Sequence, residues 1–314
     1  MISGASRKQR MPRWTAGLDA DVARSFRRSP VAVASALALV LIIGGAFLAP
    51  WLAPQNTLDL ASIELIEGKT PPLSANPYTG RVFLLGTDDQ GRDLLSALLY
   101  GSRVSLAVGI GAALLSMVTG TFLGLVAGYS GGSLDSLIMR AADVQLSLPP
   151  ILLALTISGV SKTILSPVAH EQATVWVLIL VIGLALWPQY ARPVRSLTHV
   201  EKHREYVQAA QLMGLHPVLI AYRHILPNVL SPVLVIATLT LAVAVIIEAT
   251  LSYLGVGISP THPSLGSLIR VGQQYIVSGE WWMLVFPSAL LALVSLSANL
   301  LGDWLRTALD PRAG

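Results

Sequence analysis

The chain has 314 residues, of which 53% are hydrophobic and only 12% are charged. An ordinary soluble domain has about 25% charged residues, so this composition excludes a soluble globular protein and predicts a chain that crosses a membrane several times. The sequence has no cysteine, which excludes disulfide bonds and thiolate metal sites. Its formal net charge of +4 is distributed as membrane topology requires, and we therefore expect no nucleic acid as a partner.

Six apolar segments are each close to the roughly 20 residues that a helix needs to cross the hydrocarbon core of a membrane. They cover about 31–53, 103–129, 137–159, 174–194, 229–251 and 284–303. We therefore expect an all-α protein, a polytopic membrane helix bundle with six transmembrane helices. Its expected parts are a basic cytoplasmic tail at 1–30, a first transmembrane helix at 31–53, an external region at 54–102 and a five-helix core at 103–312 with a polar loop at 196–228.

A basic tail precedes the first apolar segment, as it also does in a cleaved signal peptide. The apolar run at 31–53 is longer than the roughly 7–15 residues of a signal-peptide core. Pro54 and the two residues after it are typical of a loop. We therefore interpret this segment as a transmembrane helix that is retained.

An even number of spans places both termini on one side of the membrane. Fifteen of the 21 Lys and Arg residues fall on that side, together with the loop at 196–228, and six fall on the other side. Cytoplasmic segments carry the excess of Lys and Arg. We therefore expect a multi-pass protein of the cytoplasmic (inner) membrane, with both termini and this loop in the cytoplasm.

In the external region, the polar stretch Leu85–Asp93 precedes an apolar run from Leu94 to Tyr100. Thr87 or Asp88 can cap a short helix here, because a side-chain oxygen can accept a hydrogen bond from the first free backbone N–H groups of a helix. We expect a short external helix that is separate from the second span.

The second span carries a small residue at every fourth position. These residues are Ala112, Ser116, Gly120, Gly124 and Gly128. Residues four apart lie on one face of a helix, and small residues let two helix backbones approach closely within a membrane. We expect this face to contact another helix and not lipid.

The third span combines a charged pair with a double proline. Arg140 and Asp143 are three residues apart, so they share a helix face and a local ion pair would lower the cost of burying them. Pro149 and Pro150 follow and predict a kink or a local opening of the helix. Asp143 and Pro149 are candidates for a gate or a pathway.

Glu248 lies in the outer part of the fifth span. An ionisable residue inside a membrane is by default a candidate for a proton or substrate pathway. Because Glu248 is close to the external interface, where water or a neighbouring subunit can satisfy it, we favour a structural or gating role over a proton relay.

The polar loop contains a short helix from Glu205 to Gly214. Ala209 and Ala210 leave one face of this helix without bulk, so another surface can approach it closely. Gly214 ends the helix because glycine adopts the left-handed conformation at little cost. Pro217 is placed to begin the next helical stretch. The pattern predicts an element that docks onto another protein at the membrane surface.

Two short motifs suggest chemistry that the rest of the chain does not support. Gly68-Lys69-Thr70 resembles the end of a phosphate-binding loop, but Ile63 stands where the leading glycine would be. His199 and His203 have the spacing of zinc ligands on a helix without an obvious third ligand. No nucleophile motif occurs. We expect no metal site, no cofactor bound by this chain and no enzymatic activity, so energy must come from a partner subunit.

Several stretches, in one order from about residue 30 to residue 312, resemble permeases of the ABC importers for dipeptides and oligopeptides, and specifically the second or C-type permease of each pair. These stretches are Leu85–Asp93, Arg140–Asp143 with Pro149, Glu205–Asn228, Leu251–Gly255 and Asn299–Asp303 through Arg312. The loop from Glu205 resembles the cytoplasmic coupling loop of these permeases.

The resemblance implies a complex with a homologous permease, two cytoplasmic ATPase subunits that bind ATP and Mg, and an extracytoplasmic substrate-binding protein, all held in a lipid bilayer. The residues that it assigns to ATPase coupling are Glu205, Tyr206, Gln208, Ala209, Ala210, Gly214 and Leu215. Further candidates for the gate or pathway are Ser252, Tyr253 and Leu265, in addition to Glu248.

The chain departs from the family pattern at three of these positions. Gln208 stands in place of Glu, which removes a charge but keeps length and hydrogen-bonding capacity. Tyr253 replaces Phe, and Leu265 replaces the usual Trp, which changes the expected shape of the external gate.

Two alternatives concern the cargo and the energy source. Importers of nickel, glutathione and some sugar conjugates share the same sequence frame. A secondary transporter driven by an ion gradient could use Glu248 and Asp143 as ion carriers, but that reading leaves the docking loop unexplained.

Overall fold

The computed structural model describes residues 20–57, 59, 62–164, 167–258 and 262–309. Within these residues the regular structure is helical, and only isolated β-bridges join Ala75 to Val82 and Thr87 to Asp93. The α-helices are α1 (Ala20–Arg28), α2 (Pro30–Phe47), α3 (Ala49–Leu52), α4 (Leu94–Ser130), α5 (Gly132–Leu146), α6 (Pro150–Ile164), α7 (Pro167–Leu186), α8 (Pro188–Lys202), α9 (Glu205–Leu212), α10 (Pro217–Ile220), α11 (Leu226–Tyr253), α12 (Leu265–Tyr275) and α13 (Trp282–Leu309). A π-helical turn at Ala221–Ile225 joins α10 to α11.

Four helical stretches are long and apolar enough to cross a membrane. They are Pro30–Phe47, Leu94–Ser130, Pro217–Tyr253 and Trp282–Ala308. Two pairs of helices, α5 with α6 and α7 with α8, meet the same criterion as bent pairs, which gives six spans when each pair counts as one. The predicted class, an all-α polytopic membrane bundle, is confirmed.

Both bent pairs break at proline. α5 and α6 meet at 88°; the break contains Pro149, and Pro150 is the first residue of α6. α7 and α8 meet at 43°, and Pro188 is the first residue of α8. Proline lacks a backbone N–H and its ring clashes with the preceding turn, so a straight helix cannot continue through these positions. The kink predicted for the third span is confirmed.

The expected short external helix is wrong, because the helix that begins at Leu94 continues without a break to Ser130 as α4. Its cap is Asp93, whose carboxylate accepts a hydrogen bond from the Ser96 amide at 2.8 Å. Thr87 instead donates its hydroxyl to the Glu67 carbonyl, and Asp88 forms a buried ion pair of 2.6 Å with Arg92. Both side chains hold the loop before the helix and not the helix itself.

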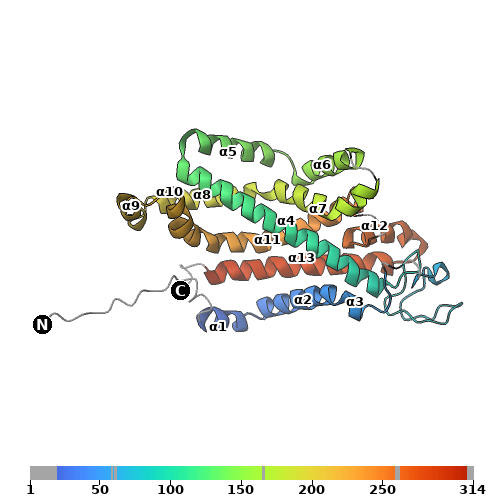
Figure 1. Ribbon diagram of the computed structural model, residues 1–314. Helices are drawn as coiled ribbons and strands as arrows, with labels where there is room; N and C mark the ends of the chain where they lie inside the picture. Colours follow the sequence, from blue (N-terminus) through green and yellow to red (C-terminus); the bar gives the residue numbers. More distant parts are fainter. Residues whose placement is uncertain (1–19, 58, 60–61, 165–166, 259–261, 310–314) are drawn as a thin grey trace.

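Residues 62–93, between α3 and α4, form a compact, loop-rich segment that is held together by polar contacts. We call this segment the cap of the bundle. Asn76 donates to the Thr70 hydroxyl at 2.8 Å, and the Thr70 amide donates to Thr87. Trp282, at the start of α13, donates its indole N–H to the Thr87 carbonyl at 3.1 Å. These bonds attach the cap to the bundle at the end that also carries α3 and α12 (Figure 1).

The long helices run side by side, with α4 crossing the bundle (Figure 1). α4 packs against α7, α8 and α11, and α13 packs against α2, α11 and α12. A buried apolar cluster that includes Val108, Ile182 and Leu251 joins α4, α7 and α11. α1, α9 and the C-terminal end of α13 lie at one end of the bundle, opposite the cap and α12 (Figure 1).

Candidate functional site

The short helix α9 projects at the end of the bundle, beyond the ends of the long helices (Figure 1). It ends in two hydrogen bonds: the Leu215 amide donates to the Ala210 carbonyl at 3.2 Å and the Gly214 amide donates to Gln211 at 2.9 Å. This is the pattern of a Schellman C-cap. Gly214 supplies the left-handed residue that it needs, with φ of +74°. Pro217 begins α10, so both sequence-based boundaries are confirmed.

The two alanines of α9 lie on different faces. Val207 and Ala210 are buried against Ile220 and Ile225 in a cluster that also contains Val229 of α11. Ala209 is exposed. The expectation that Ala209 and Ala210 form one exposed face is therefore wrong, since Ala210 anchors the helix to its own chain.

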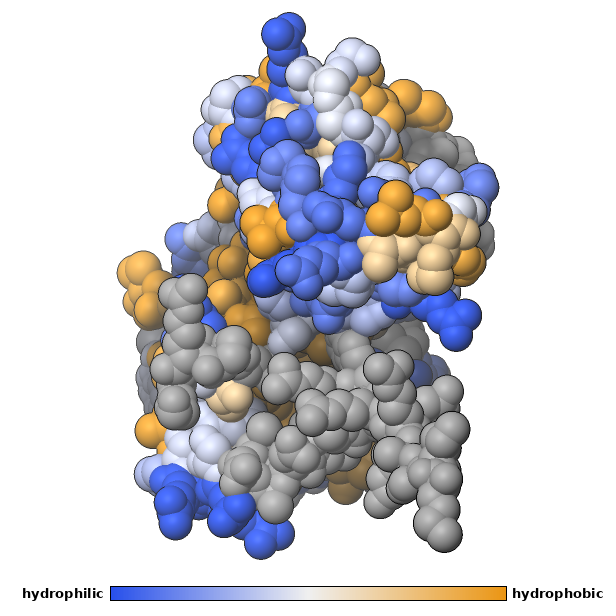
Figure 2. Space-filling model, turned by 90° about the vertical axis from the view of Figure 1, so that its left-hand side faces the viewer, coloured by the Kyte–Doolittle hydropathy of each residue, from blue (hydrophilic) through white to orange (hydrophobic). Residues whose placement is uncertain are grey.

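The exposed face of α9 is apolar toward its C-terminal end. Leu212 is 90% exposed and Met213 is 73% exposed, while Glu205, Gln208 and Ala209 complete the face. Figure 2 looks onto this end of the molecule and shows hydrophobic residues among mostly hydrophilic ones. Leu212 and Met213 together make this face of α9 a candidate for contact with another protein.

Tyr206 links α9 to two other helices. Its hydroxyl donates to the Glu201 carboxylate at the end of α8 and accepts a hydrogen bond from the Asn228 amide of α11 at 2.8 Å. Burial, and then the hydrogen bond to Glu201, raise the pKa of Tyr206 to about 12. The hydroxyl therefore keeps its proton, and with it the donor bond, at physiological pH. Sequence reasoning named Tyr206 but missed Glu201, and it placed Asn228 in the loop without a role.

The small-residue face of α4 lies directly against α8. An added Cβ would be 2.4 Å from the Trp187 carbonyl oxygen at Gly120, 2.6 Å from that of Ala191 at Gly124, and 2.6 Å from that of Arg195 at Gly128. Ala112 and Ser116 are fully buried on the same helix. The backbones of α4 and α8 are thus in contact along three turns, and α8 leads through two residues into α9.

Two ion pairs join α8 to α5. Arg195 makes two hydrogen bonds of 2.6 Å to Asp135, and Arg192 pairs with Asp143. The expected pair of Arg140 with Asp143 is therefore wrong. α8 runs beside α5 and brings the long Arg192 side chain within reach, so the partner of Asp143 is on another helix and not on its own.

The gate or pathway candidates fall into two places. Glu248, Ser252, Tyr253 and Leu265 come together where α11 meets α12, and Glu248 and Leu265 have no exposed surface. Tyr253 and Gln273 of α12 are hydrogen-bonded. Asp143 lies in α5 and Pro149 lies at the bend between α5 and α6, about a hundred residues earlier in the sequence than the first group. Both side chains are exposed.

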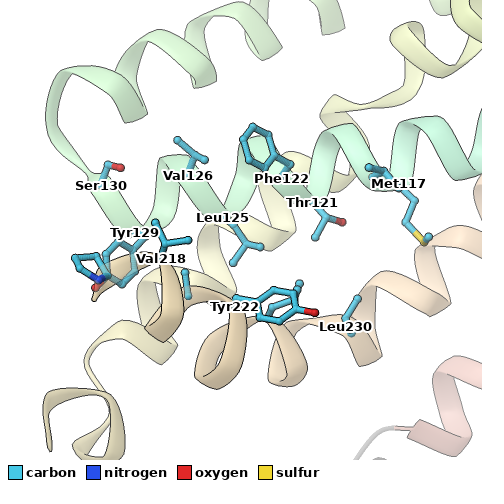
Figure 3. A pocket seen from close by; sticks show the side chains of 14 residues that line it. Met117, Thr121, Phe122, Leu125, Val126, Tyr129, Ser130, Val218, Tyr222 and Leu230 are labelled. Carbon is cyan, nitrogen blue, oxygen red and sulfur yellow. The ribbon is translucent and has the colours of Figure 1, made fainter. Parts of the chain in front are cut away.

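An apolar groove of about 790 Å³ lies between the C-terminal half of α4 and the segment from α10 to α11. Figure 3 shows Phe122 and Leu125 of α4 across from Tyr222 and Leu230. The π-helical turn forms part of this wall, and such turns occur often at functional sites. The lining is mainly apolar, with the hydroxyls of Thr121, Tyr129, Ser130 and Tyr222 and no charged side chain.

No three metal-ligating side chains lie together among the described residues. His199 and His203 make an edge-to-face ring contact at 4.9 Å, and His203 Nδ1 is hydrogen-bonded to the His199 carbonyl at 2.7 Å. The four-residue spacing of the two histidines is therefore explained by a contact between them at the end of α8.

Two family models match the chain. Residues 120–314 match "Binding-protein-dependent transport system inner membrane component", and residues 19–72 match "N-terminal TM domain of oligopeptide transport permease C". Together the two matches cover most of the chain, including α9 and its link to α8 and α11.

Individual relatives are similar over nearly their whole length. The di/tripeptide transport system permease protein DppC of Pseudomonas aeruginosa is 36% identical over 289 residues, which are 92% of this chain and 90% of that protein. The glutathione transport system permease protein GsiD of Pectobacterium atrosepticum is 37% identical over 92% of this chain and 89% of its own length. The dipeptide permease DppC of Bacillus subtilis is 34% identical over 93% and 85%.

Solved structures of the MetNI methionine ABC transporter in inward-facing conformations share the fold. One of their chains superposes with a TM-score of 0.53 at 21% identity, over 68% of this chain and 97% of that chain. At this level of identity the similarity concerns the arrangement of helices alone.

Proposed function

Because the chain belongs to the permeases of binding-protein-dependent ABC transporters, in the branch of oligopeptide permease C, we propose that it imports di- or oligopeptides across the cytoplasmic membrane as one half of a translocation path. It is a transport subunit and not itself an ATPase. In this proposal the energy of transport comes from ATP hydrolysis by a partner ATPase. An ion gradient is then not needed as the energy source.

The observation that carries the proposal is the construction of α9. Its inner face is buried through Val207 and Ala210, its C-terminal end is fixed by the Gly214 cap, and its outer face presents Leu212 to the surroundings. We assign this outer face to a cleft on the ATPase subunit, which binds ATP and Mg. Burying one Leu side chain contributes about 1.5–3 kcal/mol to such a contact.

Movement of α9 would reach the bundle through two connections. Tyr206 ties it to α8 and α11, and α8 is in backbone contact with α4 at Gly120, Gly124 and Gly128. Close packing transmits displacement because protein interiors are not compressible. In this mechanism, closure of the ATPases displaces α9, and α4, α8 and α11 move with it to alternate access to the path.

The charge distribution supports an orientation for this mechanism. α1, α9 and the end of α13 share one end of the bundle (Figure 1). Among the described residues, basic side chains lie in α1 (Arg24, Arg27, Arg28), just before α9 (Arg204) and in the last turn of α13 (Arg306). Because cytoplasmic segments carry the excess of Lys and Arg, we propose that this end, like both termini, is cytoplasmic. The cap and α12 then face the extracytoplasmic binding protein.

The full assembly proposed here contains this chain, a homologous permease, two ATPase subunits and the binding protein in a lipid bilayer. The test is reconstitution of these components in liposomes with ATP inside or outside. Uptake of a radiolabelled dipeptide that depends on both ATP and the binding protein supports the proposal. Uptake that continues without ATP contradicts it.

Glutathione is a second candidate cargo, because the GsiD relative is as similar as the peptide permeases. Nickel and sugar conjugates remain alternatives from the sequence frame. Competition of dipeptide uptake by unlabelled glutathione, dipeptide or nickel in the same liposomes ranks these cargoes directly.

A further inference from the structure

Glu248 of α11 has no exposed surface and lies where α11 meets α12 and α4. The Ser252 hydroxyl donates a hydrogen bond of 2.7 Å to its Oε1 atom. The hydroxyls of Ser105 on α4 and Ser264 before α12 also interact with this carboxylate. Its second oxygen, Oε2, forms no hydrogen bond of normal geometry among the described residues. A buried carboxylate is costly unless it is hydrogen-bonded, so these hydroxyls decide whether the group is tolerated.

Each of the three hydroxyls also accepts a hydrogen bond from a backbone amide of the segment after α11. The pairs are Ser252 with the Ile258 amide at 3.1 Å, Ser105 with the Leu265 amide at 3.1 Å, and Ser264 with the Ser267 amide at 3.2 Å. A hydroxyl has a single proton to donate. Accepting from an amide leaves that proton available for a carboxyl oxygen, and Ser252 uses it in this way toward Glu248 Oε1.

The first turn of α12 is also packed against its neighbours without space. An added Cβ on Gly266 would lie 2.2 Å from the Ala249 carbonyl oxygen of α11, and one on Gly101 of α4 would lie 3.3 Å from the Ser264 backbone. Leu265 and Leu268 are buried between α4 and α13. The first turn of α12 therefore fits against α4, α11 and α13 in one position, which we call its seat. Glu248 is a buried ionisable residue next to this position.

We propose that Glu248 is a positioning residue that holds the first turn of α12 against α4 and α11 and so keeps the external end of the path closed in the resting transporter. The inference rests on the proposed function, which makes this end external. The carboxylate acts through the three serine hydroxyls, each of which fixes one backbone amide.

Such a contact sets the balance between closed and open states. A ligand or partner shifts a conformational equilibrium only by its differential affinity for the two states. When Glu248 stabilises the closed state, opening requires the binding protein. Weakening this contact then lets the ATPases cycle without the binding protein.

Thiol labelling reports directly on the seat of α12, because the chain has no native cysteine. Leu268→Cys places a thiol at a position that is 3% exposed, and a membrane-impermeant maleimide added from outside measures its access to water. Gln274→Cys, at an exposed position of α12, controls for reagent and orientation. Both are combined with Glu248→Gln, which keeps the shape and replaces one carboxyl oxygen by an amide NH2 group that donates and cannot accept.

We expect Glu248→Gln to increase the labelling rate of Leu268→Cys by about tenfold or more, the factor that ~1.4 kcal/mol makes in an equilibrium, with Gln274→Cys unchanged. Thr240→Val is the matched control, because Thr240 is a buried polar residue of α11 outside the cluster. An unchanged rate in Glu248→Gln, or an equal increase in Thr240→Val, overturns the inference. Ser105→Ala, which removes one hydroxyl alone, gives the same measurement where Glu248→Gln yields too little folded protein, and an unchanged rate there overturns it equally.

Reconstitution supplies the functional arm. We expect ATP hydrolysis without binding protein to rise in Glu248→Gln and to stay at the wild-type level in Thr240→Val. Faster labelling with hydrolysis that still requires the binding protein contradicts a role in the gate. A wild-type complex that never responds to binding protein contradicts the proposed function instead, while the labelling result still decides whether Glu248 seats α12.

Discussion

Gly124 provides a quantitative test of the contact between α4 and α8. A Cβ at this position would lie 2.6 Å from the Ala191 carbonyl oxygen and 2.7 Å from Val194 Cβ, whereas ordinary contacts begin near 3.4 Å. Neither neighbour can rotate away, because one is backbone and the other is the branch point of a buried side chain. Gly124→Ala therefore requires the two helices to separate by most of an ångström.

Overpacking of this kind costs about 1–3 kcal/mol, and the better helix propensity of Ala returns about 0.5–1 kcal/mol. We expect a net loss of about 0–2.5 kcal/mol for Gly124→Ala. Gly124→Leu, with a much larger side chain, prevents α8 from docking and abolishes folding or assembly.

Gly159 of α6 is the matched control, since nothing lies within 4 Å of an added Cβ there. Gly159→Ala keeps the propensity gain without the clash, so the two substitutions have opposite signs. Thermal unfolding of the detergent-solubilised chain measures both. Equal stability of Gly124→Ala and Gly159→Ala, or normal assembly and transport of Gly124→Leu, would refute the close contact.

Three further predictions concern the loop and the topology. Tyr206→Phe removes the hydrogen bonds to Glu201 and Asn228, so we expect less substrate transported per ATP hydrolysed with ATPase binding retained; an unchanged ratio contradicts the proposed link. Gly214→Val lowers stability by about 1–3 kcal/mol, because valine is strained at a φ of +74°. No neighbouring atom adds a clash, since nothing lies within 4 Å of an added Cβ. Gly214→Val should weaken ATPase binding, whereas Gly214→Asn, which tolerates this conformation, should not, and equal binding of the two variants counts against the cap. A single cysteine at Gln211 should react with impermeant maleimide only from the cytoplasmic side, and labelling from outside reverses the proposed orientation.

Local rules predicted the features that depend on a few neighbouring residues. Gly214 and Pro217 mark their helix boundaries because each has a backbone restriction that acts at its own position. The same holds for Pro149 and Pro150, which break the third span in the structure as in the sequence.

The errors arose where the partner lies elsewhere in the chain. Asp143 pairs with Arg192, which is 49 residues away in sequence. No periodicity within one segment contains that information. The division of Ala209 from Ala210 was available from the sequence, since Val207 and Ala210 are three apart and share a helix face.

The proposed role of α9 as the coupling element is tested most directly at Leu212. Ala210→Asp is a poor test, because Ala210 is 1% exposed and a buried charge there destabilises the chain itself. Leu212 is 90% exposed, so Leu212→Asp leaves the fold intact and affects only what docks onto it. Leu212→Met is the control that keeps the apolar surface and volume.

The measurement is ATP hydrolysis stimulated by the binding protein and peptide uptake, followed together in liposomes that contain all partner subunits. Loss of an apolar contact worth about 1.5–3 kcal/mol predicts that Leu212→Asp lowers both by at least about tenfold, while the thermal stability of the chain matches the wild type and Leu212→Met is active. Wild-type hydrolysis and uptake in Leu212→Asp would show that energy does not enter through α9.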